Sequence, residues 1–434
     1  MRTGVRPARG ASTRTNRKLD TKEKSMAAEL FDYADLLRPD LPPAAARWTG
    51  FPEFNFVGGH NDADSVPVDG LAAAATAVLK REGRTLSTYG LESGPLGYRP
   101  LREYIARKLA RDADITCSSD EILITSGSLQ GLDLVNQVLL SPGDTVIVEQ
   151  MTYGGAITRL KRLGVNIVGV KVDHDGLSGT ALKMALEDLK RRGIRPKYIY
   201  AIPTVQNPTA TVMSRTRRAE ILGLSAIYGV PVFEDECYAD LVWEGTRPQA
   251  MRGMTQDDRV IHIGSFSKSI APALRIGYLV TGWPLMSRIL ALKSDGGSGA
   301  IEQMILAEYC PDHFDTHVRA LRKTLRRKLD VMIEALRAQF GAAAEFADPA
   351  GGIFLWVKLP DGVDTTRLTQ LALQSGVAIN PGAEWMTDAG AGQTRLRLCF
   401  AHPSEQVIRE GVASLAGVCH REFAVPARVA KEHR

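Results

Sequence analysis

The sequence predicts an α/β fold with a large domain built on a mostly parallel, seven-stranded sheet and a smaller α+β domain. Three observations support this prediction. The chain has 434 residues, more than one ordinary hydrophobic core requires. Between residues 121 and 280, short apolar runs alternate with helical stretches, as in a parallel sheet covered on both faces. Beyond about residue 300 this alternation slackens, which indicates a second, smaller domain.

The first 25 residues differ in charge from the rest of the chain. They hold eight Lys and Arg against two acidic residues, whereas the remainder holds 46 basic and 47 acidic residues. The net charge of +5 therefore belongs to a tail, and no nucleic-acid surface is expected on the folded part. We expect residues 1–25 to be disordered. They resemble either an organelle transit peptide or an overlong start before Met26, and we favour the second interpretation.

The expected elements then follow in chain order. Residues 26–68 form an arm that joins the small domain, with a short helix around 29–37, prolines at 39, 42 and 43, and a strand that ends at Gly58-Gly59. The large domain covers 69–305 and opens with helices at 70–82 and 101–109. The strands of its sheet are expected at 122–125, 145–148, 165–172, 198–202, 231–234, 260–264 and 276–280. The small domain, 306–434, holds a long charged helix at 314–340, strands at 351–359 and 395–400, and helices at 368–375 and 404–415.

The cysteine content limits the compartment and the kind of site. Five cysteines are scattered without a Cys-x-x-Cys pair, which favours a reducing compartment and argues against a disulfide framework or a zinc site. We therefore expect no metal. No run of 18 apolar residues exists, so no membrane contact is expected either. The expected location is the cytoplasm.

One stretch, residues 261–278, concentrates the chemistry. An apolar strand ends in a small polar turn that presents Lys268 between serines, and Arg275 follows seven residues later. A lysine held at a strand end can form a Schiff base with a carbonyl cofactor when burial or nearby cations keep its amine partly neutral. Ser265, Ser267 and Arg275 are the donors that a phosphate would need. A surface loop with an unrelated arginine is the alternative.

Other polar residues also stand where expected strands end, which is where ligands bind in parallel sheets. Gly127 opens a helix after the strand 122–125, so its turn suits a phosphate but is also an ordinary cap. Asp235 and Tyr238 end an otherwise buried strand, where a carboxylate without a partner is unfavourable. In the strand 395–400, alternation places Arg395 and Arg397 on one face, and either could hold a carboxylate.

The pattern Ser-x-Ser-Lys-x-x-x-Pro-x-x-Arg-x-Gly-Tyr at 265–278 resembles the cofactor-lysine motif of class I/II aminotransferases, the fold-type-I pyridoxal 5'-phosphate (PLP) enzymes. The resemblance spans roughly residues 50–415, and the separate motifs fall in the family's order. It implies the fold of a fold-type-I PLP-dependent transferase, a bound PLP, and an amino acid and a 2-oxo acid as substrates. It also implies a homodimer.

The resemblance also implies roles for single residues. Lys268 would hold the cofactor as a Schiff base and carry the substrate's Cα proton, with Asp235 facing the ring nitrogen. Asn207 and Tyr238 would bond the ring oxygen, and Tyr153 would stack on the ring. The phosphate would be bound by Gly127, Ser128, Leu129, Ser265, Ser267, Arg275 and, from the neighbouring subunit, Tyr89. The substrate carboxylate would meet Gly59, Asn207 and Arg397.

The implied reaction is the transfer of an amino group from an L-amino acid to a 2-oxo acid, which we expect to be 2-oxoglutarate. The same scaffold supports C–S lyases, decarboxylases and amino-acid oxidases, and the segment 293–299 departs from the usual aminotransferases. An aminotransferase-like transcription regulator and a non-catalytic dimeric scaffold are two further alternatives. The amino donor is not defined by the sequence, although Arg38 or Arg47 in the arm could contact an acidic side chain.

Overall fold

The computed structural model describes residues 31–39, 41–42, 44–243 and 247–426. The chain falls into two units, Met1–Gly50 and Phe51–Arg434. In the described part of the first unit, only Ala34–Leu36 is helical, as a short 3-10 turn (η1). The helix expected around 29–37 is therefore shorter within that part. The predicted disordered tail, residues 1–25, lies outside the described residues.

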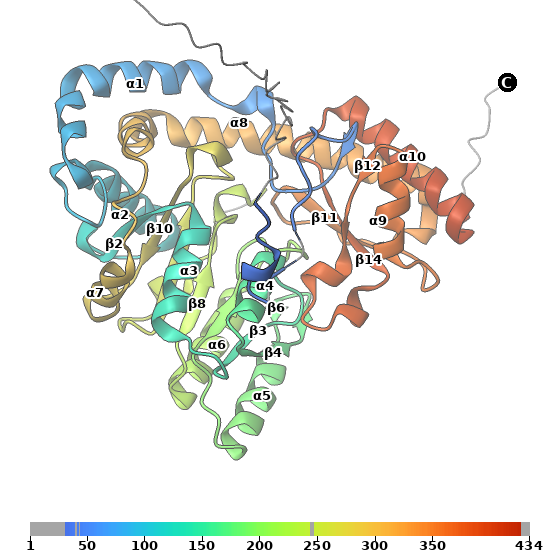
Figure 1. The fold of residues 1–434 in the computed structure, drawn as a ribbon, viewed down its shortest axis with the longest axis horizontal. Helices are drawn as coiled ribbons and strands as arrows, with labels where there is room; N and C mark the ends of the chain where they lie inside the picture. The colour runs from blue at the N-terminus through green and yellow to red at the C-terminus, as the bar shows by residue number, and fades with distance from the viewer. Residues whose placement is uncertain (1–30, 40, 43, 244–246, 427–434) are drawn as a thin grey trace, which may run out of the picture. The chain divides into compact units, whose positions relative to one another are not determined.

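All seven predicted strands of the large sheet are present, which confirms the predicted fold class. They are β2 (Ile122–Ser126), β3 (Thr145–Glu149), β4 (Asn166–Val170), β7 (Ile199–Ala201), β8 (Val232–Asp235), β9 (Val260–Ser265) and β10 (Ile276–Val280). Their order is β2-β10-β9-β8-β7-β3-β4 (Figure 1). β10 is antiparallel to both of its neighbours, and the other pairs are parallel. A small antiparallel pair, β5 (Val172–Asp173) and β6 (Gly176–Leu177), follows β4.

Helices cover both faces of this sheet, which is why its strands are apolar almost throughout. On one face Val148 and Phe233 pack with α3 (Ser128–Leu139), α4 (Gly154–Arg162) and α7 (Trp283–Leu292). On the other face Ile147 and Val232 pack with α5 (Gly179–Arg191) and α6 (Arg215–Tyr228). A further cluster joins β2 and β10 to α1 (Val68–Glu82) and α2 (Arg99–Ala113).

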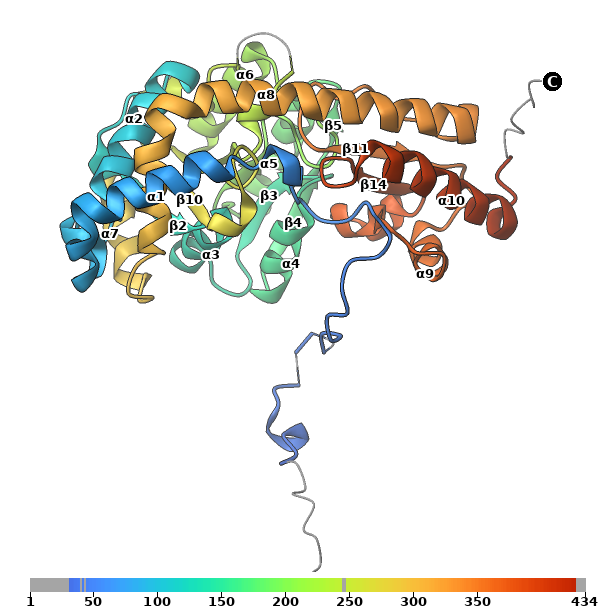
Figure 2. The same cartoon turned by 90° about the horizontal axis from the view of Figure 1, so that it is seen from above.

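The longest helix, α8 (Ala300–Phe340), begins 14 residues before the predicted helix at 314–340. Its buried residues Leu306 and Cys310 before Pro311 and Phe314 after it are each four positions apart, so the buried face of the helix continues through the proline. Residues up to Val318 pack with α1 and α2, whereas residues from Leu321 onwards pack in a separate core. Figure 2 shows α8 running from the side of α1 and α2 to that of α10 (Glu405–Phe423). The predicted boundary at 305/306 remains a proposal.

The second core contains a three-stranded antiparallel sheet in the order β11-β14-β13. These strands are Phe354–Lys358, Arg395–Cys399 and Asn380–Pro381, and the helices α9 (Thr365–Gln374) and α10 pack in the same core. The short strand β1 (Phe54–Asn55) pairs in parallel with β12 (Val377–Ala378). β1 lies within the predicted arm 26–68, and this arm and the domain boundaries 69–305 and 306–434 remain predictions.

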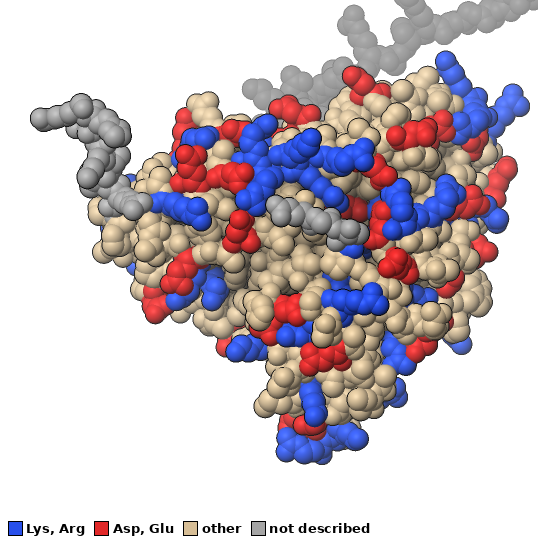
Figure 3. Space-filling view, turned by 180° about the vertical axis from the view of Figure 1, so that it is seen from behind, with Lys and Arg blue, Asp and Glu red and all other residues tan. Residues whose placement is uncertain are grey.

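Charged side chains of both signs are interspersed on the face opposite to that of Figure 1 (Figure 3). Over the described ranges, no helix combines the length and the apolar character that crossing a membrane requires. The same part of the chain contains no group of three or more His, Cys, Asp or Glu side chains arranged to hold a metal ion.

Candidate active site

A cavity of about 590 Å³ is lined by residues from the strand ends of the large sheet and from the smaller sheet. Most of the predicted site residues line it: Gly59, Ser128, Leu129, Tyr153, Asn207, Asp235, Tyr238, Ser265, Ser267, Lys268, Arg275 and Arg397. Two predicted residues, Gly127 and Tyr89, do not. The fold therefore brings together side chains that are up to 338 positions apart in sequence.

Lys268 follows β9 and points to the loop that carries Gly59. Its Nζ donates a hydrogen bond of 2.8 Å to the Gly59 carbonyl oxygen. A Cβ at position 59 would overlap this amine, so a larger residue there would displace the end of the Lys268 side chain. Burial lowers the pKa of Lys268, and the nearby Arg397 and Arg275 lower it further. These are the conditions under which a lysine amine becomes available as a nucleophile and a base.

The turn at Gly127 forms a cradle for an anion. Gly127 adopts a φ of 73°, a conformation that favours glycine, and it caps the twelve-residue helix α3. The first amides of a helix, here those of Ser128 and Leu129, have no partner within the helix. The Arg275 guanidinium lies against Gly127, where a Cβ would overlap it, and its Nη2 donates to the Ser126 carbonyl at 3.2 Å. This combination of amides and a cation suits a phosphate.

Asp235 ends β8 and is 5% exposed. Its Oδ2 accepts a hydrogen bond of 2.7 Å from the Tyr200 hydroxyl, and its Oδ1 accepts one of 3.1 Å from the Cys237 amide. Among the described residues, no cation lies within ion-pair distance of this carboxyl group. Burial raises its pKa, which hydrogen bonds from Tyr200 and Cys237 only partly offset. A buried carboxyl group of this kind is stabilised as a carboxylate when a cationic group enters the cavity.

Arg397 is a buried cation that has no acidic partner among the described residues, just as Asp235 has no cationic one. It is 3% exposed, and it makes no ion pair with the described residues. Its guanidinium donates to Asn207 Oδ1 at 3.2 Å and to the Gly58 carbonyl at 2.9 Å, while its Nε is buried without a partner. The Trp385 ring lies 3.8 Å from the guanidinium carbon and fixes its plane. Arg395, the other candidate on the same strand, does not line the cavity.

Asn207 links Arg397 to Tyr238. Its Nδ2 donates to the Tyr238 hydroxyl at 3.3 Å, opposite the oxygen that receives Arg397. Burial raises the pKa of Tyr238, so its phenol stays protonated and can donate a hydrogen bond at neutral pH. Asn207 and Tyr238 therefore present two donors at one point of the cavity wall.

These residues fit PLP. The cradle at Gly127 suits its phosphate, the desolvated amine of Lys268 suits its aldehyde, and the uncompensated Asp235 suits a protonated ring nitrogen. The fold and the site together define a PLP-dependent enzyme of fold type I.

The comparisons with known proteins identify the family. The sequence profile of aminotransferase class I and II matches residues 60–415, and the chain belongs to this family of PLP-dependent aminotransferases. It is 30% identical to aromatic-amino-acid aminotransferase 1 of Thermococcus litoralis, over 85% of this chain and 88% of that protein. The kynurenine aminotransferase of Pyrococcus horikoshii, solved with pyridoxamine phosphate (PMP), matches with a TM-score of 0.80 and 30% identity over 85% and 91% of the two chains. An uncharacterized HTH-type transcriptional regulator of Bacillus subtilis is 31% identical over 81% of this chain and 71% of that protein.

Several residues of the site were not predicted. Trp385 and Lys161 line the cavity, and Tyr200 holds Asp235 from the neighbouring strand. No spacing in the sequence marks them, because each reaches the site through strand order or domain packing. Cys237 also lines the cavity and lies inside the predicted motif at 232–238, so the motif itself could have indicated it.

Tyr89 is 92% exposed and lines a separate cavity of about 340 Å³ together with Gly296 and Gly297. Its predicted contact is with a neighbouring subunit, so a single chain does not test it. The role of Tyr89 therefore remains a prediction.

A buried acid, Glu149, provides a testable pH dependence. It is fully buried at the end of β3, and burial raises its pKa to about 8, although Gln206 donates to its Oε2 at 2.9 Å. Between pH 6 and 8 the native protein therefore keeps a proton that the unfolded chain releases, and the free energy of unfolding falls as pH rises. Glu149→Gln removes this effect.

We expect urea denaturation to show that the variant loses roughly 2 kcal/mol less unfolding free energy than the wild type between pH 6 and pH 8. Equal losses in the two proteins would show that Glu149 is ionised at both pH values.

Proposed function

We propose that the protein transfers the amino group of an L-amino acid to a 2-oxo acid, with 2-oxoglutarate as the acceptor and Lys268 as the catalytic base. The observation that carries this proposal is that one cavity holds a half-buried lysine and a buried arginine, neither of which makes an ion pair with the described residues. Lys268 has a lowered pKa, and Arg397 has an unpartnered Nε. An amino acid brings the complementary groups, an amine and a carboxylate.

Each residue then has a defined task. PLP, when bound, supplies an aldehyde that receives the amino group and a ring that withdraws electrons from the substrate carbon. Arg397 and Asn207 hold the substrate carboxylate, which fixes the direction of the Cα–H bond. The neutral amine of Lys268 takes the Cα proton and returns it to the carbon of the aldehyde group. Asp235 keeps a negative charge at the ring nitrogen, and Tyr238 donates its phenol proton to the ring oxygen.

The choice of 2-oxoglutarate rests on a second carboxylate. Four cations line the cavity: Lys161, Lys268, Arg275 and Arg397. The phosphate, the base and the α-carboxylate account for the last three. Lys161, on α4, lines the cavity and is exposed to solvent. It is therefore available to bind the distal carboxylate of a dicarboxylic acid.

We further propose that the protein works as a homodimer in which Tyr89 reaches the phosphate of the neighbouring site. The large exposed area of Tyr89 supports this proposal, because a tyrosine side chain is usually covered by apolar or aromatic surface. Sedimentation of the holoprotein should give twice the chain mass. Tyr89→Phe should weaken PLP binding about tenfold without changing that mass, and a monomeric holoprotein with full PLP affinity would contradict the proposal.

A spectroscopic half-reaction tests the function. Mixing the holoprotein with an amino acid should replace the visible absorbance of the lysine-bound cofactor with that of the aminated cofactor, and 2-oxoglutarate should restore it. Because relatives are named for aromatic amino acids and kynurenine, the panel of donors should include both. Release of ammonia or carbon dioxide, or uptake of oxygen, in place of this cycle would refute transamination in favour of lyase, decarboxylase or oxidase chemistry.

A DNA-binding role is the second candidate, because several relatives are named transcriptional regulators. Salt-sensitive retardation of DNA by the purified chain would support it. Full turnover without any retardation of DNA would exclude the DNA-binding role and support the enzymatic function alone.

A further inference from the structure

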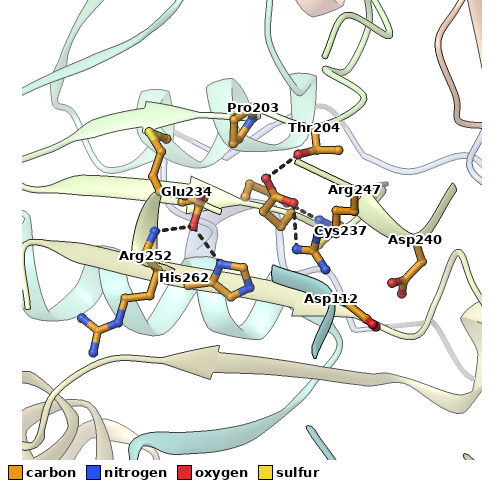
Figure 4. Close-up of polar contacts among 12 residues, drawn as sticks. Asp112, Pro203, Thr204, Glu234, Cys237, Asp240, Arg247, Arg252 and His262 are labelled. Carbon is orange, nitrogen blue, oxygen red and sulfur yellow. Dashed lines mark hydrogen bonds and ion pairs between the residues drawn. The ribbon is translucent and has the colours of Figure 1, made fainter. Parts of the chain in front are cut away.

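A buried polar cluster lies on the face of the sheet that is turned away from the cavity, and the reaction does not use it. Along β8, Phe233 packs with α3 and α4, whereas Val232 packs with α5 and α6. Because side chains alternate along a strand, Asp235 shares the side of Phe233, and Glu234 and Glu236 share the side of Val232. Thr204 and Arg247 both donate to the Glu236 carboxylate. Glu234 contacts His262 instead, as Figure 4 shows.

Arg218, on α6, is the centre of this cluster. Its side chain is fully buried, with an exposure of 0%. Its Nε donates to the Met213 carbonyl and its Nη2 to the Pro203 carbonyl, both at 3.0 Å. The same guanidinium donates to Thr204 Oγ1 at 2.8 Å. One side chain therefore holds both ends of the segment 203–213, which carries Asn207.

Glu236 ties the end of β8 to the same guanidinium. Its Oε1 accepts from Arg218 at 3.2 Å and from the Thr204 hydroxyl at 2.7 Å, while its Oε2 accepts from Arg247 at 2.8 Å. Glu236 directly follows Asp235 and precedes Tyr238 by two residues. The loop of Asn207 and the strand end of Asp235 are thus fastened to each other from behind the sheet.

We propose that Arg218 and Glu236 are positioning residues that set the spacing between Asp235 on one side and Asn207 and Tyr238 on the other. That spacing allows the ring nitrogen and the ring oxygen of PLP to be engaged at the same time. This inference rests on the proposed roles of Asp235, Asn207 and Tyr238. A buried ion pair is weak support for stability alone, because apolar side chains of the same volume often replace it without loss. Apolar side chains cannot reproduce the fixed directions of the hydrogen bonds that such an ion pair makes.

The chain offers matched variants for a test. Arg218→Lys keeps the charge but cannot reach four acceptors from one ammonium group. Thr204→Val is milder, since it removes only the hydroxyl that joins Arg218 to Glu236. Glu234→Gln is the control. Glu234 is as fully buried as Arg218 and lies on β8, the strand of Asp235. Its hydrogen bonds, however, go to His262 and to the amides of Met251 and Arg252. Its distance of 4.0 Å from Arg218 is too long for a hydrogen bond.

Equilibrium dialysis of each protein should compare PLP with its analogue that lacks the ring hydroxyl. The wild type and Glu234→Gln should bind the analogue about tenfold more weakly than PLP, which is the loss of roughly one hydrogen bond. Arg218→Lys should bind PLP about tenfold more weakly than the wild type and should barely distinguish the two compounds. Thr204→Val should shift in the same direction by a smaller factor.

Two results would overturn the inference, and they differ. If Arg218→Lys and Thr204→Val keep the full tenfold discrimination, Arg218 serves the fold alone. If the wild type itself binds both compounds equally, the roles of Asn207 and Tyr238 in the proposed function fail first. Thermal melting of each variant identifies any loss of PLP binding that comes from unfolding. Glu234→Gln should be destabilised but should still discriminate between PLP and its analogue.

Discussion

Replacement of Lys268 by alanine is expected to lower kcat by at least about 10³-fold, because both the nucleophile that holds the cofactor and the base that moves the proton are lost. The protein should remain folded. The amine is buried without an acidic partner, so its removal takes an unfavourable charge out of the interior. Within the described part of the chain, the side chain loses one hydrogen bond, that to the Gly59 carbonyl.

Three measurements distinguish this result from a general loss of structure. Thermal melting of Lys268→Ala should match that of the wild type within a few degrees. The cofactor of this variant should be removed by dialysis alone, since no covalent link to the protein remains. Addition of a small primary amine should restore part of the proton transfer, whereas Lys268→Arg, which keeps the charge but not a neutral amine, should stay inactive. Turnover by either variant near the wild-type rate would refute the assignment of Lys268 as the base.

Replacement of Arg397 by lysine is expected to lower kcat/KM for amino acids by about 10²–10³-fold, the loss that follows when one partner of a buried, hydrogen-bonded charge pair is truncated. A single ammonium group cannot pair with both carboxylate oxygens and also stack on Trp385 at 3.8 Å. The loss should fall on KM and kcat together, because the carboxylate contact both binds the substrate and orients its Cα–H bond.

The adjacent arginine supplies the control. Arg395→Lys changes the same strand two residues away, outside the cavity, and should leave kcat/KM within about twofold, as is usual for a half-exposed position. A primary amine without a carboxylate should react equally slowly with the wild type and with Arg397→Lys. An equal loss for both lysine variants, or a larger loss in Arg395→Lys, would contradict the assignment.

The seven strands of the large sheet were predictable because each is a short and mainly apolar run, as expected for a sheet that is buried on both faces. The helices were predictable in kind but not in extent. α8 begins at Ala300, 14 residues before the predicted start, because Pro311 does not interrupt its buried face. Local periodicity does not reveal whether tertiary contacts extend a helix.

The sequence by itself determined the fold class, because the strands are mainly apolar runs, and it indicated the chemistry through the resemblance of the motif at 265–278 to the cofactor-lysine motif of aminotransferases. Only the tertiary structure showed that, of the two arginines that strand alternation places on one face, Arg397 lines the cavity and Arg395 does not. It likewise brought in Trp385, Glu149 and Arg218. These side chains act through burial and through neighbours distant in the chain, and no local pattern records either property.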